Sequence, residues 1–234
     1  MKKVLWVVAI SAFVFTAVLG VQLLLGLIIS PFISADVMAM PAVSVLFSII
    51  SYGLALLMII YLPPKIFKKK LAKSSRESLG LRGLPTWTDI GLAPVGYIAT
   101  IVLAAGVTAL FNLMPWFDAN EVQDLGYSHY MVGFERGIVF VLLAIIAPIV
   151  EELIFRGWLY GKLRVKIPKW VAIIVTSLVF GLVHLQWNVG ITVFCMSIVT
   201  CTLREITGSI YAGTLVHIIN NSVAFYLVYV AGMM

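Results

Sequence analysis

Residues 136–160 read RGIVFVLLAIIAPIVEELIFRGWLY, an apolar run that carries three ionisable groups near its end. The run exceeds the roughly 20 residues that an α-helix needs to cross the hydrocarbon core of a bilayer. Glu151, Glu152 and Arg156 would then lie inside the membrane, where a charged side chain costs at least about 2.5 kcal/mol on insertion scales. The segment therefore predicts a membrane-spanning helix and a functional site within it.

The rest of the chain has the same apolar character. Of its 234 residues, 62% are hydrophobic and only 11% are charged, which excludes an ordinary water-soluble domain. The apolar runs predict an all-α fold, a polytopic membrane helix bundle of about seven transmembrane helices, or eight with a split or re-entrant segment. Besides 136–160, the predicted spans are about 4–33, 41–62, 88–113, 170–187, 189–204 and 209–231.

The positive charge of the chain is concentrated in the connections between these runs. The net charge of +6 therefore indicates positive-inside topology rather than nucleic-acid binding. Basic connections at about 63–88 and 162–169 are expected in the cytoplasm, and the acidic connection 118–135 outside. The N-terminus would be cytoplasmic. Its apolar run is about twice the length of a signal-peptide core, so it is expected to remain as the first span.

The chain is expected to form a single membrane domain with two parts. Residues 1–133 would supply N-terminal transmembrane helices and the basic loop, and residues 134–231 the functional core. Cys195 and Cys201 are six positions apart in one apolar segment, so they would point to different faces of a helix. This spacing suits neither a disulfide framework nor a Cys-x-x-Cys metal site, and both cysteines are expected to pack in the interior.

Helical spacing separates the roles of the three charged residues in 136–160. Glu152 and Arg156 are four apart and share a helix face, so they can form an ion pair inside the membrane. Glu151 lies about 100° around the helix from Glu152, and its position at i+4 is occupied by Phe155. Glu151 is therefore expected to face another helix and to be available as a general base.

Two later segments carry polar residues within predicted spans. Phe180 and His184 are four apart and share a face, and Gly181 between them allows a neighbouring helix to approach closely. His184 is expected near the middle of the fifth span. His217 and Asn221 share a face of the last span in the same way.

These side chains are expected at similar depths in the bilayer. At 1.5 Å per residue from the cytoplasmic ends of their helices, Glu151, His184, His217 and Asn221 lie roughly 14 to 22 Å into the membrane. Each could separately form an interhelical hydrogen bond. Four such residues at one depth instead favour a single polar cavity.

The three motifs occur in the order Glu-Glu-x-x-x-Arg, Phe-x-x-x-His and His-x-x-x-Asn. In this order the chain resembles the CAAX-processing and bacteriocin-processing (CPBP) family of intramembrane endopeptidases, over about residues 134–225. The stretch 204–209 is also similar to the connection before that family's last helix. The resemblance implies hydrolysis of a peptide bond near the C-terminus of a membrane-associated or prenylated (CAAX-type) protein or peptide.

The resemblance also implies a role for each site residue. Glu151 would activate the attacking water and His184 would help to hold it. His217 and Asn221 would donate hydrogen bonds to the oxyanion of the tetrahedral intermediate. The supporting residues would be Glu152, Arg156 and Phe180.

The residues favour a mechanism without a metal or other cofactor. Zinc would be expected to take Glu151, His184 and His217 as ligands. The sequence has no His-Glu-x-x-His motif, however, and Asn221 is a poorer zinc ligand than oxyanion donor. A mechanism that uses a zinc ion therefore remains the alternative to the metal-free mechanism.

Two other functions stay open. A bacteriocin self-immunity protein or a scaffold could share the fold without catalysis. A transporter could also bury Glu, Arg and His, but it would usually repeat the pattern in both halves of the chain. The first half offers only neutral residues such as Gln22, Ser48 and Ser51, which disfavours transport.

The expected partners are the lipid bilayer and a membrane-associated protein or peptide substrate, with no nucleic acid. The short chain, with little sequence outside its predicted spans, is most similar to prokaryotic members of the family. The protein is therefore expected to be a multi-pass protein of a prokaryotic plasma membrane.

Overall fold

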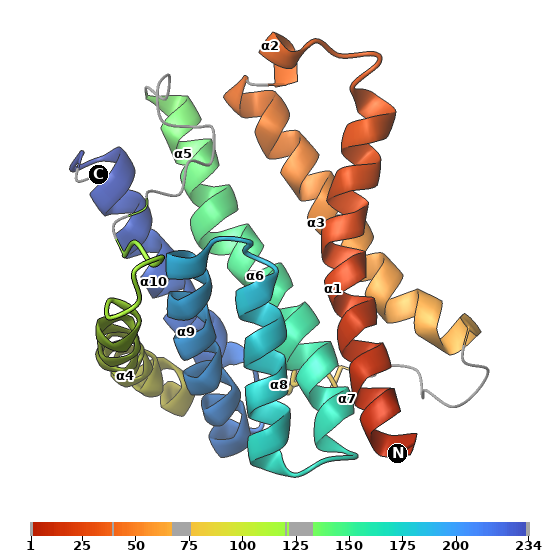
Figure 1. Ribbon diagram of the computed structural model, residues 1–234, viewed down its shortest axis with the longest axis vertical. Helices are drawn as coiled ribbons and strands as arrows, with labels where there is room; N and C mark the ends of the chain where they lie inside the picture. The colour runs from red at the N-terminus through yellow and green to blue at the C-terminus, as the bar shows by residue number, and fades with distance from the viewer. Residues whose placement is uncertain (1, 39, 67–75, 120, 122–132, 233–234) are drawn as a thin grey trace.

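The computed structural model describes residues 2–38, 40–66, 76–119, 121 and 133–232, and these are helices and connections without a strand. The all-α fold predicted from the sequence is confirmed (Figure 1). The helices are α1 (Lys2–Ile29), α2 (Ala35–Met38), α3 (Pro41–Ile66), α4 (Trp87–Phe111), α5 (Phe134–Phe140), η1 (Val141–Ile146), α6 (Ala147–Glu152), η2 (Leu153–Tyr160), α7 (Gly161–Arg164), α8 (Lys169–Leu182), α9 (Trp187–Thr207) and α10 (Tyr211–Tyr229).

Four helical segments in the described part of the chain are long and apolar enough to cross a membrane, namely Lys3–Ile29, Trp87–Phe111, Phe134–Arg164 and Trp187–Thr207. The apolar helices Leu46–Leu62 and Lys169–Leu182 are shorter. These helices support an integral membrane protein, but the predicted count of seven spans is not confirmed. α8 has only 14 residues, and α10 loses apolar character because it contains His217, Asn220 and Asn221.

The elements from α5 to α7 form one continuous helical run, Phe134–Arg164, at the centre of the molecule. The antiparallel pair α1 and α3 lies along one side of this run, and α8, α9 and α10 lie along the other (Figure 1). The N-terminus and the turn between α7 and α8 share one end of the molecule, and the C-terminus lies at the opposite end. The centre of the predicted basic loop, residues 67–75, lies outside the described residues.

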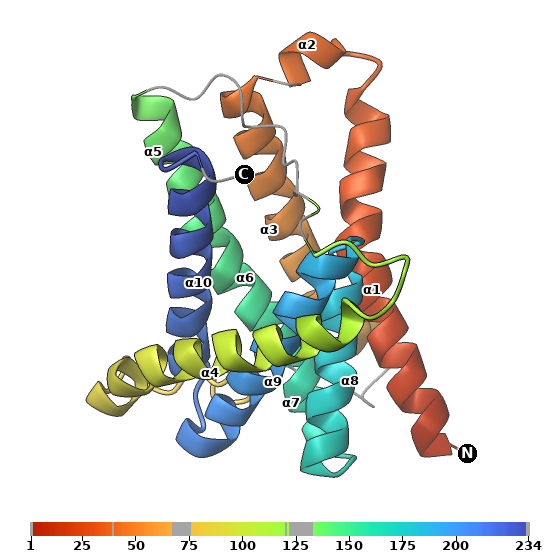
Figure 2. The ribbon, with the colours of Figure 1, turned by 60° about the vertical axis from the view of Figure 1, so that its left-hand side comes forward.

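α4 runs crosswise over α9 and α10, as Figure 2 shows. A capping box fixes its start, because Thr86 and Asp89 exchange hydrogen bonds. Ser209 also donates to the buried Asp89 over 2.7 Å, which ties the start of α4 to the start of α10. At Gly96 a Cβ would lie only 2.8 Å from the Val216 side chain. Glycine at this position therefore permits the close crossing.

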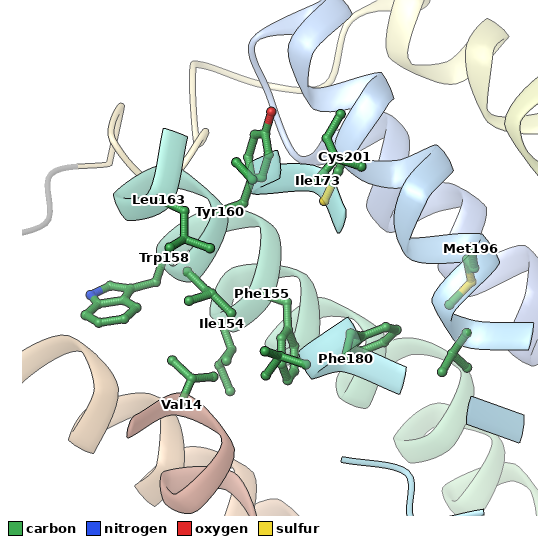
Figure 3. Close-up of a cluster of buried hydrophobic side chains, with 14 of the residues drawn as sticks. Val14, Ile154, Phe155, Trp158, Tyr160, Leu163, Ile173, Phe180, Met196 and Cys201 are labelled. Atoms are coloured by element: carbon green, nitrogen blue, oxygen red, sulfur yellow. The ribbon is translucent and has the colours of Figure 1, made fainter. Parts of the chain in front are cut away.

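One apolar cluster joins both halves of the chain, with members on α1, η2, α8, α9 and α10. In Figure 3, Val14 of α1 lies close to Ile154, and the rings of Phe155 and Phe180 lie together. The centroids of these two rings are 4.8 Å apart. Cys195 and Cys201 are both buried and free, in agreement with the packing role predicted for them.

The connection between α8 and α9 differs from the prediction. The fifth span was expected to reach residue 187 and the sixth to begin at 189, but α8 ends at Leu182 and α9 begins at Trp187. His184 therefore lies in the connection and not near the middle of a span, so that prediction is wrong. Leu185 has a φ of 57°, a left-handed conformation that is rare for a bulky residue and reverses the chain.

Gly181 and Gly190 form the contact between α8 and α9. A Cβ at Gly181 would lie 2.8 Å from the Gly190 carbonyl oxygen, and one at Gly190 would lie 3.0 Å from the Gly181 carbonyl oxygen. Backbone therefore meets backbone, and neither side can move aside as a flexible side chain could. The close approach predicted at Gly181 is confirmed.

Gly181→Ala is expected to lower the free energy of unfolding by about 1–3 kcal/mol, because the added methyl group must push α8 and α9 apart. Thermal unfolding in detergent would measure the change. Gly91→Ala in α4 is the matched control, since nothing lies within 4 Å of its added Cβ. Alanine is the better helix former, so the control should not lose stability. Equal stability of the two variants would contradict the tight crossing.

Candidate active site

The ion pair predicted between Glu152 and Arg156 is present. Arg156 Nη1 lies 3.1 Å from Glu152 Oε1, and both side chains are completely buried. Arg156 also donates from Nε to Thr200 Oγ1 over 2.7 Å, and its guanidinium carbon lies 4.2 Å from the centre of the Phe180 ring. α6, η2, α8 and α9 thus meet around one compensated pair of charges.

His217 lies between the two glutamates. Its Nδ1 is 3.1 Å from Glu152 Oε1, and its Nε2 is 3.7 Å from Glu151 Oε2. An ionised carboxylate can only accept a hydrogen bond, so Nδ1 carries the hydrogen in this contact. Gly213 lies one turn earlier on α10, where a Cβ would be 3.3 Å from Glu152 Oε2. The glycine thus allows α10 to approach the carboxylate.

Glu151 differs from Glu152 in its surroundings. Its side chain keeps an exposed fraction of 13%, whereas that of Glu152 is 0%. Tyr52 of α3 donates from its hydroxyl to Glu151 Oε1 over 3.1 Å. Glu151 therefore contacts other helices, as its spacing predicted. Part of the Glu151 carboxylate therefore lies at the accessible surface of the protein, whereas that of Glu152 does not.

The Phe180 ring separates the two histidines of the site. Its centroid lies 5.0 Å from that of His184 and 5.8 Å from that of His217. His184 Nδ1 lies 2.8 Å from the Phe180 carbonyl oxygen, which accepts the Nδ1 hydrogen at the end of α8. The acceptor nitrogen of a neutral His184 is then Nε2. His184 also interacts electrostatically with Glu151 and with His217.

Asn221 lies one turn beyond His217 on α10. Its Nδ2 donates to the Leu143 carbonyl oxygen over 3.0 Å, and its Oδ1 accepts from Asn220 over 3.2 Å. An amide nitrogen carries two hydrogens, so the bond to Leu143 uses one of them. The sequence prediction missed this structural role, in which Asn221 holds α10 against η1.

The helix that carries the glutamates widens on both sides of them. η1 and η2 are π-helical, and α6 between them holds Glu151 and Glu152. Side chains from other helices bind carbonyl oxygens of both wide segments: Asn221 binds Leu143, and Arg204 binds Gly157 over 3.0 Å. π-helical turns inside α-helices are frequent at functional sites.

Two residues of this network were not predicted from the sequence. Tyr52 and Thr200 lie on α3 and α9 and contact Glu151 and Arg156. Each of these residues places a hydroxyl group within an apolar run, and this is the sequence feature that could have identified it. Helical spacing alone does not show which distant helix such a hydroxyl meets.

The donors do not form a metal-binding group. In the described residues, no three side chains of His, Cys, Asp and Glu converge closely enough to bind one metal ion. His217 Nδ1 is bound to Glu152, and its Nε2 faces Glu151. The residues of the alternative zinc set, Glu151, His184 and His217, are not grouped as three ligands in the described residues.

An apolar cavity lies between the end of α4 and the connection between α8 and α9. Its volume is about 480 Å³, and Gly181, Leu185 and Phe194 contribute to its wall. His184 lies between Gly181 and Leu185 in the sequence but is not among the residues that line the cavity.

Comparison with known protein families matches residues 134–223 to type II CAAX prenyl endopeptidase Rce1-like proteins. The resemblance predicted from the three motifs is confirmed over this segment, which covers less than half of the chain. No curated protein and no solved structure matches the chain. Glu151, His184, His217 and Asn221 lie inside the matched segment, and Tyr52 lies outside it.

Proposed function

We propose that the protein is an intramembrane endopeptidase of the CPBP type. It hydrolyses a peptide bond near the C-terminus of a membrane-associated or prenylated protein or peptide. The match of residues 134–223 to a peptidase family supports hydrolysis. The observation that carries the proposal is the difference between two adjacent carboxylates, because Glu151 is partly exposed and has no cation at i+4, whereas Glu152 is buried and paired with Arg156.

Glu151 is the general base of the proposed reaction. It takes a proton from a water molecule, whose oxygen attacks the carbonyl carbon of the scissile peptide bond. His184, with Nδ1 bound to Phe180, holds this water through Nε2. Glu151 then passes the proton to the nitrogen of the leaving amine. The carbon–nitrogen bond breaks to give a carboxylic acid and an amine, and the acid then transfers its proton to the amine or to solvent.

His217 and Asn221 stabilise the oxyanion of the tetrahedral intermediate. Nδ1 of His217 is held by Glu152, so His217 donates to the oxyanion through Nε2 and carries both hydrogens. Asn221 donates the amide hydrogen that Leu143 does not use. None of these steps requires a metal ion.

The apolar cavity of about 480 Å³, whose wall includes Gly181 and Leu185 on either side of His184 in the sequence, supports an apolar substrate group. We place the N-terminus and the α7–α8 turn in the cytoplasm. Lys162, Arg164, Lys166 and Lys169 lie in or beside this turn, and basic connections are typical of the cytoplasmic side. The protein then acts on protein or peptide substrates that are attached to the plasma membrane.

The purified protein is expected to cleave a prenylated CAAX peptide in detergent and to remain active after treatment with a metal chelator. An unprenylated peptide of the same sequence is the control for recognition of the lipid. Mass spectrometry of the products would locate the cleaved bond. Loss of cleavage with chelator, restored by zinc, would contradict the metal-free mechanism.

A cell-based test separates catalysis from an immunity or scaffold role. Glu151→Ala and His217→Ala should each abolish the biological effect of the protein if that effect depends on hydrolysis. Preservation of the effect in both variants would overturn the endopeptidase proposal. Both variants must be present in the membrane at the level of the parent protein.

A further inference from the structure

On the basis of the endopeptidase function proposed above, we propose that Tyr52 is a positioning residue for Glu151. Tyr52 lies on α3, outside the segment that matches the peptidase family. Its hydroxyl donates to Glu151 Oε1 over 3.1 Å. The N-terminal half of the chain thus contributes a group to the site.

The packing of α3 brings Tyr52 to this position. α3 contacts α5, α6 and η2 of the central run. The buried positions of α3 are spaced four apart, at Ser51, Ala55 and Ile59, as expected for one helix face. Tyr52 follows Ser51 at the edge of this buried face and contacts Glu151 of α6.

The two glutamates need different kinds of partner. Arg156 holds Glu152 and also neutralises its charge, which is suitable for a residue that does not react. Glu151 has an apolar residue at i+4, so another helix must fix its side chain. A tyrosine hydroxyl can orient a carboxylate by a charge-assisted hydrogen bond without supplying a compensating charge. Tyr52 therefore fixes the orientation of Glu151 without adding a cation beside it.

The geometry also assigns the two oxygens of Glu151 to different contacts. Oε1 accepts from Tyr52, and Oε2 faces His217 Nε2 at 3.7 Å. The hydrogen bond from Tyr52 to Oε1 thus orients the carboxylate so that Oε2 faces the oxyanion donor His217. Removal of the phenol hydroxyl would free the rotation of the carboxylate while the Glu152–Arg156 pair stays intact. Loss of the hydroxyl should therefore affect the chemical step rather than substrate binding.

Tyr52→Phe is expected to lower kcat by about 10- to 100-fold with KM unchanged, because one charge-assisted hydrogen bond is lost. The measurement is the steady-state cleavage of the prenylated peptide by the full chain. Tyr61→Phe on the same helix is the matched control, because Tyr61 is exposed, and it should retain the parental rate. In a protein that already carries Glu151→Gln, adding Tyr52→Phe should not lower kcat further.

The outcomes distinguish this inference from the proposed function. If the parent protein cleaves the peptide and Tyr52→Phe has the parental kcat, the role of Tyr52 is overturned and the endopeptidase function stands. If the parent protein cleaves no peptide, the proposed function is overturned and the role of Tyr52 with it. If Tyr52→Phe does not fold, Tyr52→Gln, which restores an N–H donor, is compared with Tyr52→Leu. Equal rates of those two variants would overturn the positioning role.

Discussion

Glu151→Gln is expected to lower kcat by about 10³-fold, because the variant keeps the size and hydrogen-bonding shape of the side chain but loses the general base. KM should change little, since the proposed loss is confined to the chemical step. The stability of the protein should also change little, because Glu151 is partly exposed and is not the carboxylate bound to Arg156. Steady-state cleavage and thermal unfolding of the same preparation would measure both quantities.

Glu135→Gln is the control for this variant. Glu135 is exposed at the first turn of the same continuous helical run, so its replacement removes an equal charge away from the site. It should cleave at the parental rate. A Glu151→Gln protein that keeps more than about a tenth of the parental kcat would contradict the general-base role, for which 10²- to 10⁴-fold effects are typical.

Arg156→Met is expected to lower the free energy of unfolding by about 3–5 kcal/mol, because it leaves Glu152 buried without its positive partner. The loss should exceed that of any exposed ion pair in the described structure. Arg164→Met supplies the comparison: Arg164 Nε lies 3.0 Å from Glu205 Oε1, but the two side chains are 43% and 24% exposed. Solvent screening limits that loss to about 0–1 kcal/mol.

Thermal unfolding in detergent would measure both arginine variants. The double variant Glu152→Gln/Arg156→Met should recover part of the stability lost in Arg156→Met, because it no longer buries an unpaired charge. Equal losses for Arg156→Met and Arg164→Met would show that burial does not determine the strength of the two pairs. A double variant less stable than Arg156→Met would contradict the charge-based explanation.

Local spacing predicted much of the site. A four-residue separation places Glu152 against Arg156 whether the second residue lies in an α-helix or at the start of a π-helical segment. It also left Glu151 facing other helices, where Tyr52 and His217 contact it. Such predictions succeed because they depend on the geometry of a single helix.

Predictions that depend on the ends and packing of helices were less accurate. The apolar run at 170–187 does not reveal that the chain reverses at Leu185, so His184 was placed within a span rather than after α8. The crosswise path of α4 depends on Gly96, whose neighbours are on α9 and α10. The π-helical segments are likewise stabilised by Asn221 and Arg204 from other helices. None of these long-range contacts has a signature within its own segment.

The short length of α8 has a consequence for the surrounding lipid. Its 14 residues extend about 21 Å, against a hydrocarbon core of about 30 Å. Trp170, Ile174 and Leu178 are exposed along this helix and would face acyl chains. A helix with this hydrophobic mismatch is expected to thin the bilayer locally. Thinning would bring headgroups and water closer to the connection after α8 that carries His184, and would shorten the path through hydrocarbon for the peptide substrate proposed above.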